Sequence, residues 1–112
     1  MVEDNFDNSE YGIHSYEAIE LIKQFFNSNL PQFELIESYA ESPYWGVRYS
    51  FKNLSISIIG DVGYGITISI DGKEFPLWQY DRTVNNAMKT NKKNILYQLN
   101  VLNRFLSEIH LE

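Results

Sequence analysis

The side chains that most often carry chemistry are few in this chain and lie far apart. It contains two histidines, His14 and His110, and no cysteine. A zinc site takes three or four protein ligands, and these histidines stand near opposite ends of the sequence with no third partner in sight. Without cysteine there are no thiolate ligands, thiol nucleophiles or disulfides. We therefore expect no metal site and assign both histidines to helix ends.

Two other patterns that can mark a site have simpler explanations here. The segment Gly60-Asp61-Val62-Gly63-Tyr64-Gly65 resembles a phosphate-binding loop. It lies between two predicted strands, however, whereas such loops lead into a helix N-terminus. Acids suited to general acid–base catalysis do not converge, because Glu34 and Glu37 are expected on opposite faces of one strand. We expect neither an enzyme nor a cofactor, although groups from distant positions could still meet in the fold.

Composition and charge restrict the class of partner. The chain of 112 residues suits a single domain, and its 44% hydrophobic residues supply a core. The net charge is −6, and residues 1–45 hold nine acidic residues and one basic residue. This acidic half argues against nucleic acid or an anionic membrane as the main partner, because phosphate groups need clustered lysine and arginine. It suits a basic protein partner.

Neither a membrane span nor a signal peptide is expected. No apolar run approaches the roughly 20 residues that cross a bilayer. The first ten residues, MVEDNFDNSE, lack the basic start and apolar core of a signal peptide. We therefore expect a cytoplasmic protein. Residues 1–12 are predicted to form a flexible acidic arm, and residues 111–112 could derive from an expression tag.

Two hairpins are the clearest structural prediction. Apolar and polar residues alternate through residues 45–60, and the alternation is interrupted only at Lys52-Asn53. A two-residue turn there brings apolar side chains face to face, and Asp71-Gly72 does the same for residues 66–79. The expected pairs are Phe51 with Leu54, Tyr49 with Ile56, Val47 with Ile58, Ile70 with Lys73, Ile68 with Phe75 and Ile66 with Leu77.

Helices are expected on either side of these strands. Apolar residues recur at helical spacing after Ser15, the expected N-cap, and a longer apolar stripe runs from about residue 94 to residue 110. Residues 33–40 are predicted to be an edge strand, because their alternation is imperfect and their acids would discourage pairing with another molecule. Residues 80–93 are polar, and within them a short helical turn would suit Val84, Ala87 and Met88.

This order of elements predicts an α+β two-layer sandwich, with about five antiparallel strands and both helices on one face of the sheet. The other face is then open. The side chains expected on it are Arg48, Ser50, Ser57, Ile59, Thr67, Ser69, Glu74, Pro76 and Trp78. Trp78 and Tyr80 beside Arg48 would have the composition of a binding hot spot. In the alternative interpretation, Trp78 packs against residues 80–93 or the N-terminal arm.

In size, acidity, lack of cysteine and element order, the whole chain resembles the small α+β immunity proteins that bacteria encode beside polymorphic or contact-dependent toxins. The likeness lies in these general features and not in a motif. It implies a protein that binds a cognate toxin and occludes its active site, which in many such toxins is a basic nuclease cleft. Glu34, Glu37 and Glu41 would then steer the partner, with Trp78 or Tyr80 as an anchor.

Two other functions stay open. The chain could be a small interaction domain that self-associates, for example as a homodimer, through its edge strand or open sheet face. It could also be an enzyme or small-ligand binder with a site that the sequence does not reveal. A dimer that Trp78→Ala dissociates would favour the former, and a deep pocket with convergent polar groups would favour the latter.

Overall fold

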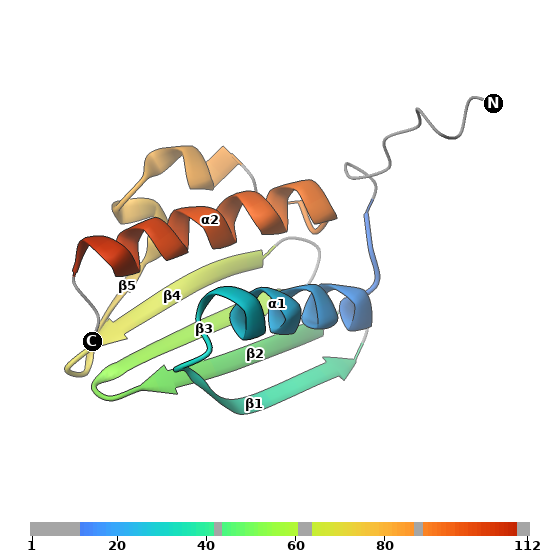
Figure 1. Cartoon of the computed structure of the whole chain (residues 1–112). Coiled ribbons are helices and arrows are strands. Elements are labelled where there is room, and N and C mark those ends of the chain that lie inside the picture. Colours follow the sequence, from blue (N-terminus) through green and yellow to red (C-terminus); the bar gives the residue numbers. More distant parts are fainter. Residues whose placement is uncertain (1–11, 42–43, 61–63, 87–88, 110–112) are drawn as a thin grey trace.

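In the computed structural model the chain folds into one sheet and two long helices (Figure 1). The structure describes residues 12–41, 44–60, 64–86 and 89–109. The helices are α1, Ser15–Asn29, and α2, Lys92–Glu108. The strands are β1, Glu34–Glu41; β2, Tyr44–Phe51; β3, Leu54–Gly60; β4, Tyr64–Ile70; and β5, Lys73–Pro76. Two 3-10 helices, η2 (Leu77–Gln79) and η3 (Arg82–Asn86), lie between β5 and α2.

Several expectations fall on residues outside these ranges. They concern the arm up to residue 11, the turn at residues 42–43, residues 61–63 of the glycine-rich segment, Ala87 and Met88, and residues 110–112 with His110. Gly12, which was assigned to the arm, forms an isolated antiparallel bridge with Asn91. Of the polar segment before α2, Val84 is buried in η3, in agreement with the expected helical turn.

The five strands form an antiparallel meander whose order across the sheet is β1-β2-β3-β4-β5. The structure confirms both hairpin registers next to their turns. These registers matter because a slip of one residue would turn every apolar side chain outward. The confirmed pairs are Phe51–Leu54, Tyr49–Ile56, Val47–Ile58, Ile70–Lys73 and Ile68–Phe75. The two turns also contact each other, since Asn53 Nδ2 donates to Asp71 Oδ1 at 2.6 Å.

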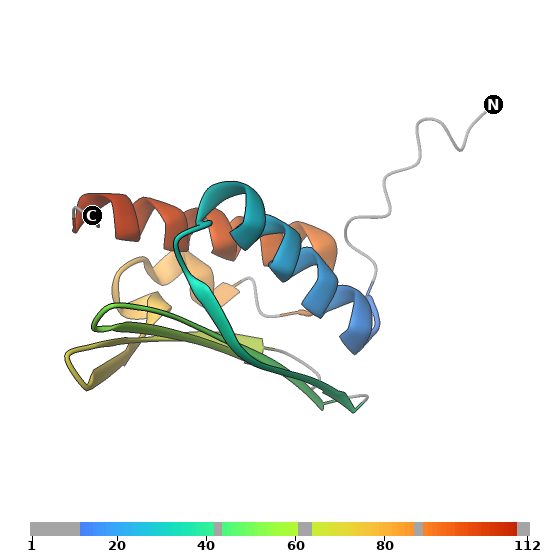
Figure 2. The same cartoon turned by 60° about the horizontal axis from the view of Figure 1, so that its bottom comes forward.

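Both helices pack on the same face of the sheet, which confirms the two-layer α+β sandwich (Figure 2). The predicted N-cap of α1, Ser15, is wrong: the N-cap is His14. Glu17 explains the shift, because its carboxylate accepts a hydrogen bond from the His14 backbone N–H at 3.2 Å. Asn91 caps α2 by accepting from the backbone N–H of Asn94 at 2.7 Å.

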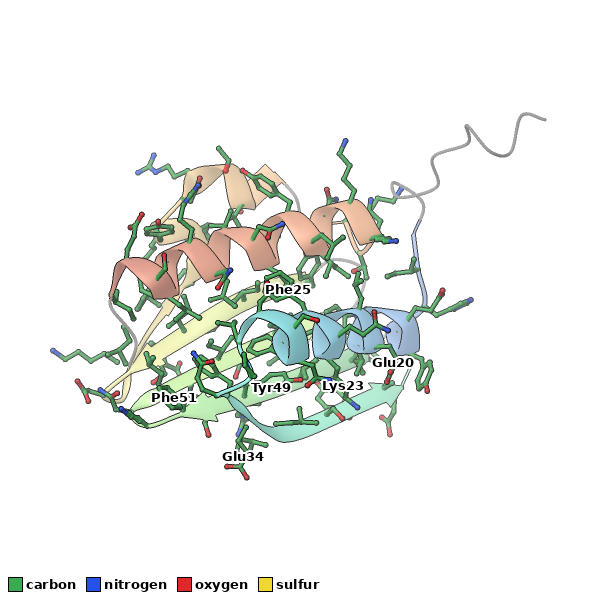
Figure 3. The ribbon with its side chains drawn as sticks, viewed as in Figure 1. Glu20, Lys23, Phe25, Glu34, Tyr49 and Phe51 are labelled. Carbon is green, nitrogen blue, oxygen red and sulfur yellow. The ribbon has the colours of Figure 1, made fainter. Side chains whose placement is uncertain are left out.

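The core lies between the helices and the inner face of the sheet. The Phe26 ring of α1 stacks on Tyr49 of β2 at a centroid distance of 3.8 Å and meets Phe33 edge-on at 5.9 Å. Figure 3 shows Tyr49 beneath α1, whereas Glu34 points away from the helices. The largest fully buried apolar side chains are Trp45, Phe26, Ile22, Ile56, Ile58, Ile68, Leu77, Ile95, Leu99, Leu102 and Leu106.

Tyr64 is a core residue whose hydroxyl finds no hydrogen-bond partner in the described structure. Burial raises the pKa of Tyr64, because the phenolate would lose its hydration. The folded protein therefore holds this proton more tightly than the unfolded chain, in which tyrosine titrates near pH 10. Burial, and next the charge of Glu20, also raise the pKa of Tyr49.

Stability is therefore expected to fall as the pH rises above about 10, by up to about 1.4 kcal/mol per pH unit for each such tyrosine. Tyr64→Phe should weaken this alkaline fall without abolishing it, because Tyr49 still titrates. At pH 7 the variant should be as stable as the parent or more so, since an unpartnered buried hydroxyl has been removed. Urea unfolding between pH 7 and pH 11.5 measures both effects, and an equally steep fall in the variant would contradict this account.

Candidate functional site

The outer face of the sheet is the surface opposite the two helices (Figure 2). Residues directly opposite each other on antiparallel strands point to the same face, so the register arranges this face in rows. The rows are Glu41–Tyr44; Tyr39–Gly46–Ile59–Gly65; Glu37–Arg48–Ser57–Thr67–Pro76; and Glu34–Ser50–Ser55–Ser69–Glu74. Acids therefore line the β1 edge, large apolar groups gather at one end, and small hydroxyl residues fill the middle.

A β-bulge between Leu35 and Glu37 decides which residues of β1 face outward. It inserts Ile36 as an extra residue, so that Glu34 and Glu37 both lie on the outer face. The prediction that these two acids point to opposite faces is therefore wrong, because it assumed unbroken alternation. The prediction of an edge strand is confirmed, and Glu34, Glu37 and Glu41 are all exposed.

A shallow depression of about 180 Å³ lies on the outer face beside Tyr39. Gly46 lets the Tyr39 ring lie against the backbone of the next strand, because a Cβ at residue 46 would lie only 2.5 Å from that ring. Ile59, Glu37 and Arg48 line the rest of the depression. Tyr39 and Ile59 stay exposed, at 41% and 56% of their accessible surface.

The charges around this depression are accessible to a partner. Glu37 and Arg48 form an ion pair at 3.6 Å, and each side chain is about half exposed. An exposed pair of this kind contributes about 0–1 kcal/mol, so a partner can replace it at small cost. Glu34 and Glu41 form no ion pair within the described part of the chain. The carboxylates can therefore receive lysine or arginine side chains beside an aromatic ring, which also attracts cations.

Trp78 and Tyr80 follow the last strand and do not lie beside Arg48, contrary to the prediction. The ladder between β4 and β5 ends at Pro76, so the expected pair of Ile66 with Leu77 is wrong. Proline has no N–H to donate to a ladder, and the chain turns away into η2 at this point. The strand order also separates β5 from β2 by two strands, which keeps both aromatic residues away from Arg48.

Tyr80 instead takes part in contacts between the end of the sheet and α2. Its ring meets Phe105 edge-on at 5.0 Å, and its hydroxyl accepts from Arg104 Nε at 3.2 Å. Arg104 also forms an ion pair with Asp81. Hydrogen bonds from Thr83, and next from Arg104, lower the pKa of Asp81. These contacts hold η3 against the helix and engage both the ring and the hydroxyl of the half-buried Tyr80.

Trp78 lies at a separate, half-open cavity of about 150 Å³ that residues of β4, β5, η2, η3 and α2 line. Tyr64 and Gln98 are among the residues that line it. Trp78 itself is 44% exposed and shares the cavity with Val84 of η3 and with Thr67 and Pro76 of the sheet. The cavity is smaller than the roughly 300–1,000 Å³ of ordinary ligand sites.

Sequence reasoning missed the aromatic residues of the outer face. Tyr39 and Tyr44 were not singled out, and Ile59 was placed outward without a role. The available signal was the spacing of Tyr39 and Glu41, because residues two apart on a strand share a face. Tyr39 lies opposite Gly46 of β2. We define the acidic-aromatic patch as Glu34, Glu37, Tyr39, Glu41, Tyr44 and Ile59, all exposed.

Neither a metal centre nor a membrane span is found in the described ranges: no group of three or more His, Asp or Glu side chains comes together there, and no helix there is long and apolar enough to cross a bilayer. Comparison with known proteins finds no match among family models, curated proteins or solved structures. The functional argument therefore rests on the acidic-aromatic patch itself.

Proposed function

We propose that this protein is a non-enzymatic, cytoplasmic binding module that holds a basic protein partner on the acidic-aromatic patch. An immunity protein that occludes the basic cleft of a toxin would work in this way. The observation that supports the proposal most is the exposure of Tyr39, Tyr44 and Ile59 beside three acids on the face opposite the helices. Apolar groups gathered in this way on a surface mark interaction sites more often than chance exposure.

The depression beside Tyr39 suits a lysine or arginine side chain of the partner. Its aliphatic stem would pack against Ile59, while its charge would lie near Glu37 and over the Tyr39 ring. Glu34 and Glu41 would attract the partner during the encounter. Arg48 offers donors to a partner carboxylate and would reject a uniformly basic surface, which supplies specificity.

The experiment that tests this function uses the proteins encoded by the genes adjacent to the gene for this chain. Each is produced alone and together with the chain, and growth of the host reports toxicity. Calorimetry with the purified pair measures affinity. A neighbour that is toxic alone, harmless with the chain and bound by the patch would support the proposal. A homodimer that buries the patch and binds no neighbour would favour a self-associating module instead.

Reversing the three acids to lysine (Glu34→Lys, Glu37→Lys and Glu41→Lys) is expected to weaken partner binding about 10–30-fold at low salt and less at high salt. For a matched comparison, Glu41→Lys alone is measured beside Glu74→Lys, because each changes the net charge by two units and the two exposed acids lie on the same face at opposite edges of the sheet. Calorimetry at 50 mM and 500 mM salt measures all three variants. Equal effects of the two single changes would contradict steering by β1.

Tyr39→Ala is expected to weaken the same complex about 30-fold or more, because a rigid aromatic side chain at the centre of an interface is a typical hot spot. Tyr16→Ala is the control, since Tyr16 is a more exposed tyrosine on α1, at 68%. Binding isotherms for both variants provide the measurement. If Tyr39→Ala bound as the parent does, the patch would not be the binding surface.

A further inference from the structure

Among the described residues, no strand pairs with the outer edge of β1. β1 is the first strand in the sheet order and pairs with β2 on one side only. All eight of its residues are exposed, including Leu35, Ile36 and Tyr39. An edge strand with free N–H and C=O groups is a template for a further strand. The bulge disturbs this template only near Ile36, and Glu37–Glu41 keep a regular register.

The register identifies the backbone groups that face away from β2. In an antiparallel ladder, opposed residues alternate between pairs that exchange both hydrogen bonds and pairs that exchange none. The two-residue turn at Lys52-Asn53 makes Phe51 and Leu54 a bonded pair, so Val47 and Trp45 direct their backbone groups toward β3. Ser38 lies opposite Val47, and Ala40 lies opposite Trp45. Ser38 and Ala40 therefore direct their N–H and C=O groups to the open edge.

The side chains of β1 determine what an added strand can carry. On the outer face it would lie beside Glu37, Tyr39 and Glu41, so lysine or arginine at alternate positions is favoured. On the helix side it would lie beside Ser38 and Ala40, which are small and leave room for apolar side chains. A second copy of β1 would instead bring like carboxylates together, which is destabilising.

We propose that β1 receives an extended basic segment of the partner as a sixth strand, with lysine or arginine alternating with apolar residues. The inference rests on the proposed function and names its mode of recognition. Main-chain hydrogen bonds to Ser38 and Ala40 supply the attachment, and the alternating side chains supply the selection of sequence. The neighbouring depression then receives a side chain from the same partner.

The test uses a nine-residue synthetic peptide of alternating lysine and valine, mixed with the intact protein at 50 mM salt. Saturation is expected to slow amide hydrogen exchange of Ser38 and Ala40 at least tenfold. Two further peptides serve as controls: one with the same composition and its lysines grouped together, and one N-methylated at alternate residues. Both should bind at least tenfold more weakly. Ala40→Pro removes one edge N–H and should weaken binding by a similar factor while leaving urea unfolding unchanged.

The outcomes separate this inference from the proposed function. If the natural partner binds with a dependence on Tyr39 while Ala40→Pro and backbone N-methylation change nothing, strand addition is wrong and the patch function stands. Absence of Ser38 and Ala40 protection at millimolar peptide overturns strand addition, as does a homodimer formed through β1. If the lysine–valine peptide protects Ser38 and Ala40 but no neighbouring gene product binds the chain, the edge site is supported and the proposed function is not.

Discussion

Replacing Phe26 by alanine is expected to lower the free energy of unfolding by about 3–5 kcal/mol, the usual cost of removing a buried aromatic side chain. Phe26 is 1% exposed and forms the centre of an aromatic cluster that joins α1 to the sheet. Its ring stacks on Tyr49 and meets Phe33 edge-on, and these contacts add to the burial. Because domains are stable by only about 5–15 kcal/mol, the variant should unfold at a much lower urea concentration.

Tyr16→Ala is the matched control on the same helix. Tyr16 is 68% exposed, and an exposed substitution usually changes stability by no more than about 0.5 kcal/mol. Urea unfolding followed by circular dichroism compares the two variants with the parent. A loss below 1 kcal/mol for Phe26→Ala would show that α1 is not held to the sheet through this cluster.

The sheet was predictable because two local signals agree with each other. A two-residue turn at Lys52-Asn53 and another at Asp71-Gly72 each fix a register, and each register places apolar residues on a single face. Both helices were predictable because their apolar stripes are long and regular. With one apolar sheet face and two amphipathic helices, the layered architecture follows with few alternatives.

The face of β1 was not predictable in the same way. The sequence does not indicate the bulge at Ile36, because two adjacent apolar residues, Leu35 and Ile36, also occur in strands without a bulge. One extra residue reverses the orientation of every side chain before it. For this reason Glu34 was separated from Glu37 in the sequence-based prediction, although the structure brings both to one face.

The end of the second hairpin was misjudged for a different reason. The strand was extended past Pro76 to residue 79, because Leu77 continues the alternation. In the structure Leu77 is buried at 1% exposure, as the alternation predicts, yet it lies in η2. Tertiary contacts of Tyr80 with Phe105 and Arg104 then draw the chain toward α2. Such long-range contacts cannot be read from local pattern.

The acidic-aromatic patch depends on these same features. The bulge gathers its acids, and Gly46 admits the Tyr39 ring. Six residues were proposed from the sequence for partner binding. Four of them lie on the outer face of the sheet: Glu34, Glu37, Glu41 and Arg48. The two aromatic residues, Trp78 and Tyr80, lie after β5 and away from Arg48. They were chosen by type and proximity in sequence and not by strand register.

Gly60→Ala is expected to lower the free energy of unfolding by about 3 kcal/mol, the upper end of the usual cost of overpacking. A Cβ at residue 60 would lie 2.4 Å from the ring of Trp45. That ring is 1% exposed and lies against Tyr64 at a centroid distance of 5.9 Å. It therefore cannot move aside without displacing other core side chains, because protein interiors are close-packed.

Gly65→Ala is the matched control, and its expected effect has the opposite sign. Gly65 lies on the adjacent strand, and a Cβ built on it meets no atom within 4 Å. Its φ is outside the left-handed region, so alanine should stabilise the protein by about 0.4–1 kcal/mol through the lower entropy of the unfolded chain. Urea midpoints of the two variants measured in parallel test the pair. If Gly60→Ala were as stable as Gly65→Ala, the close packing of Trp45 against β3 would be refuted.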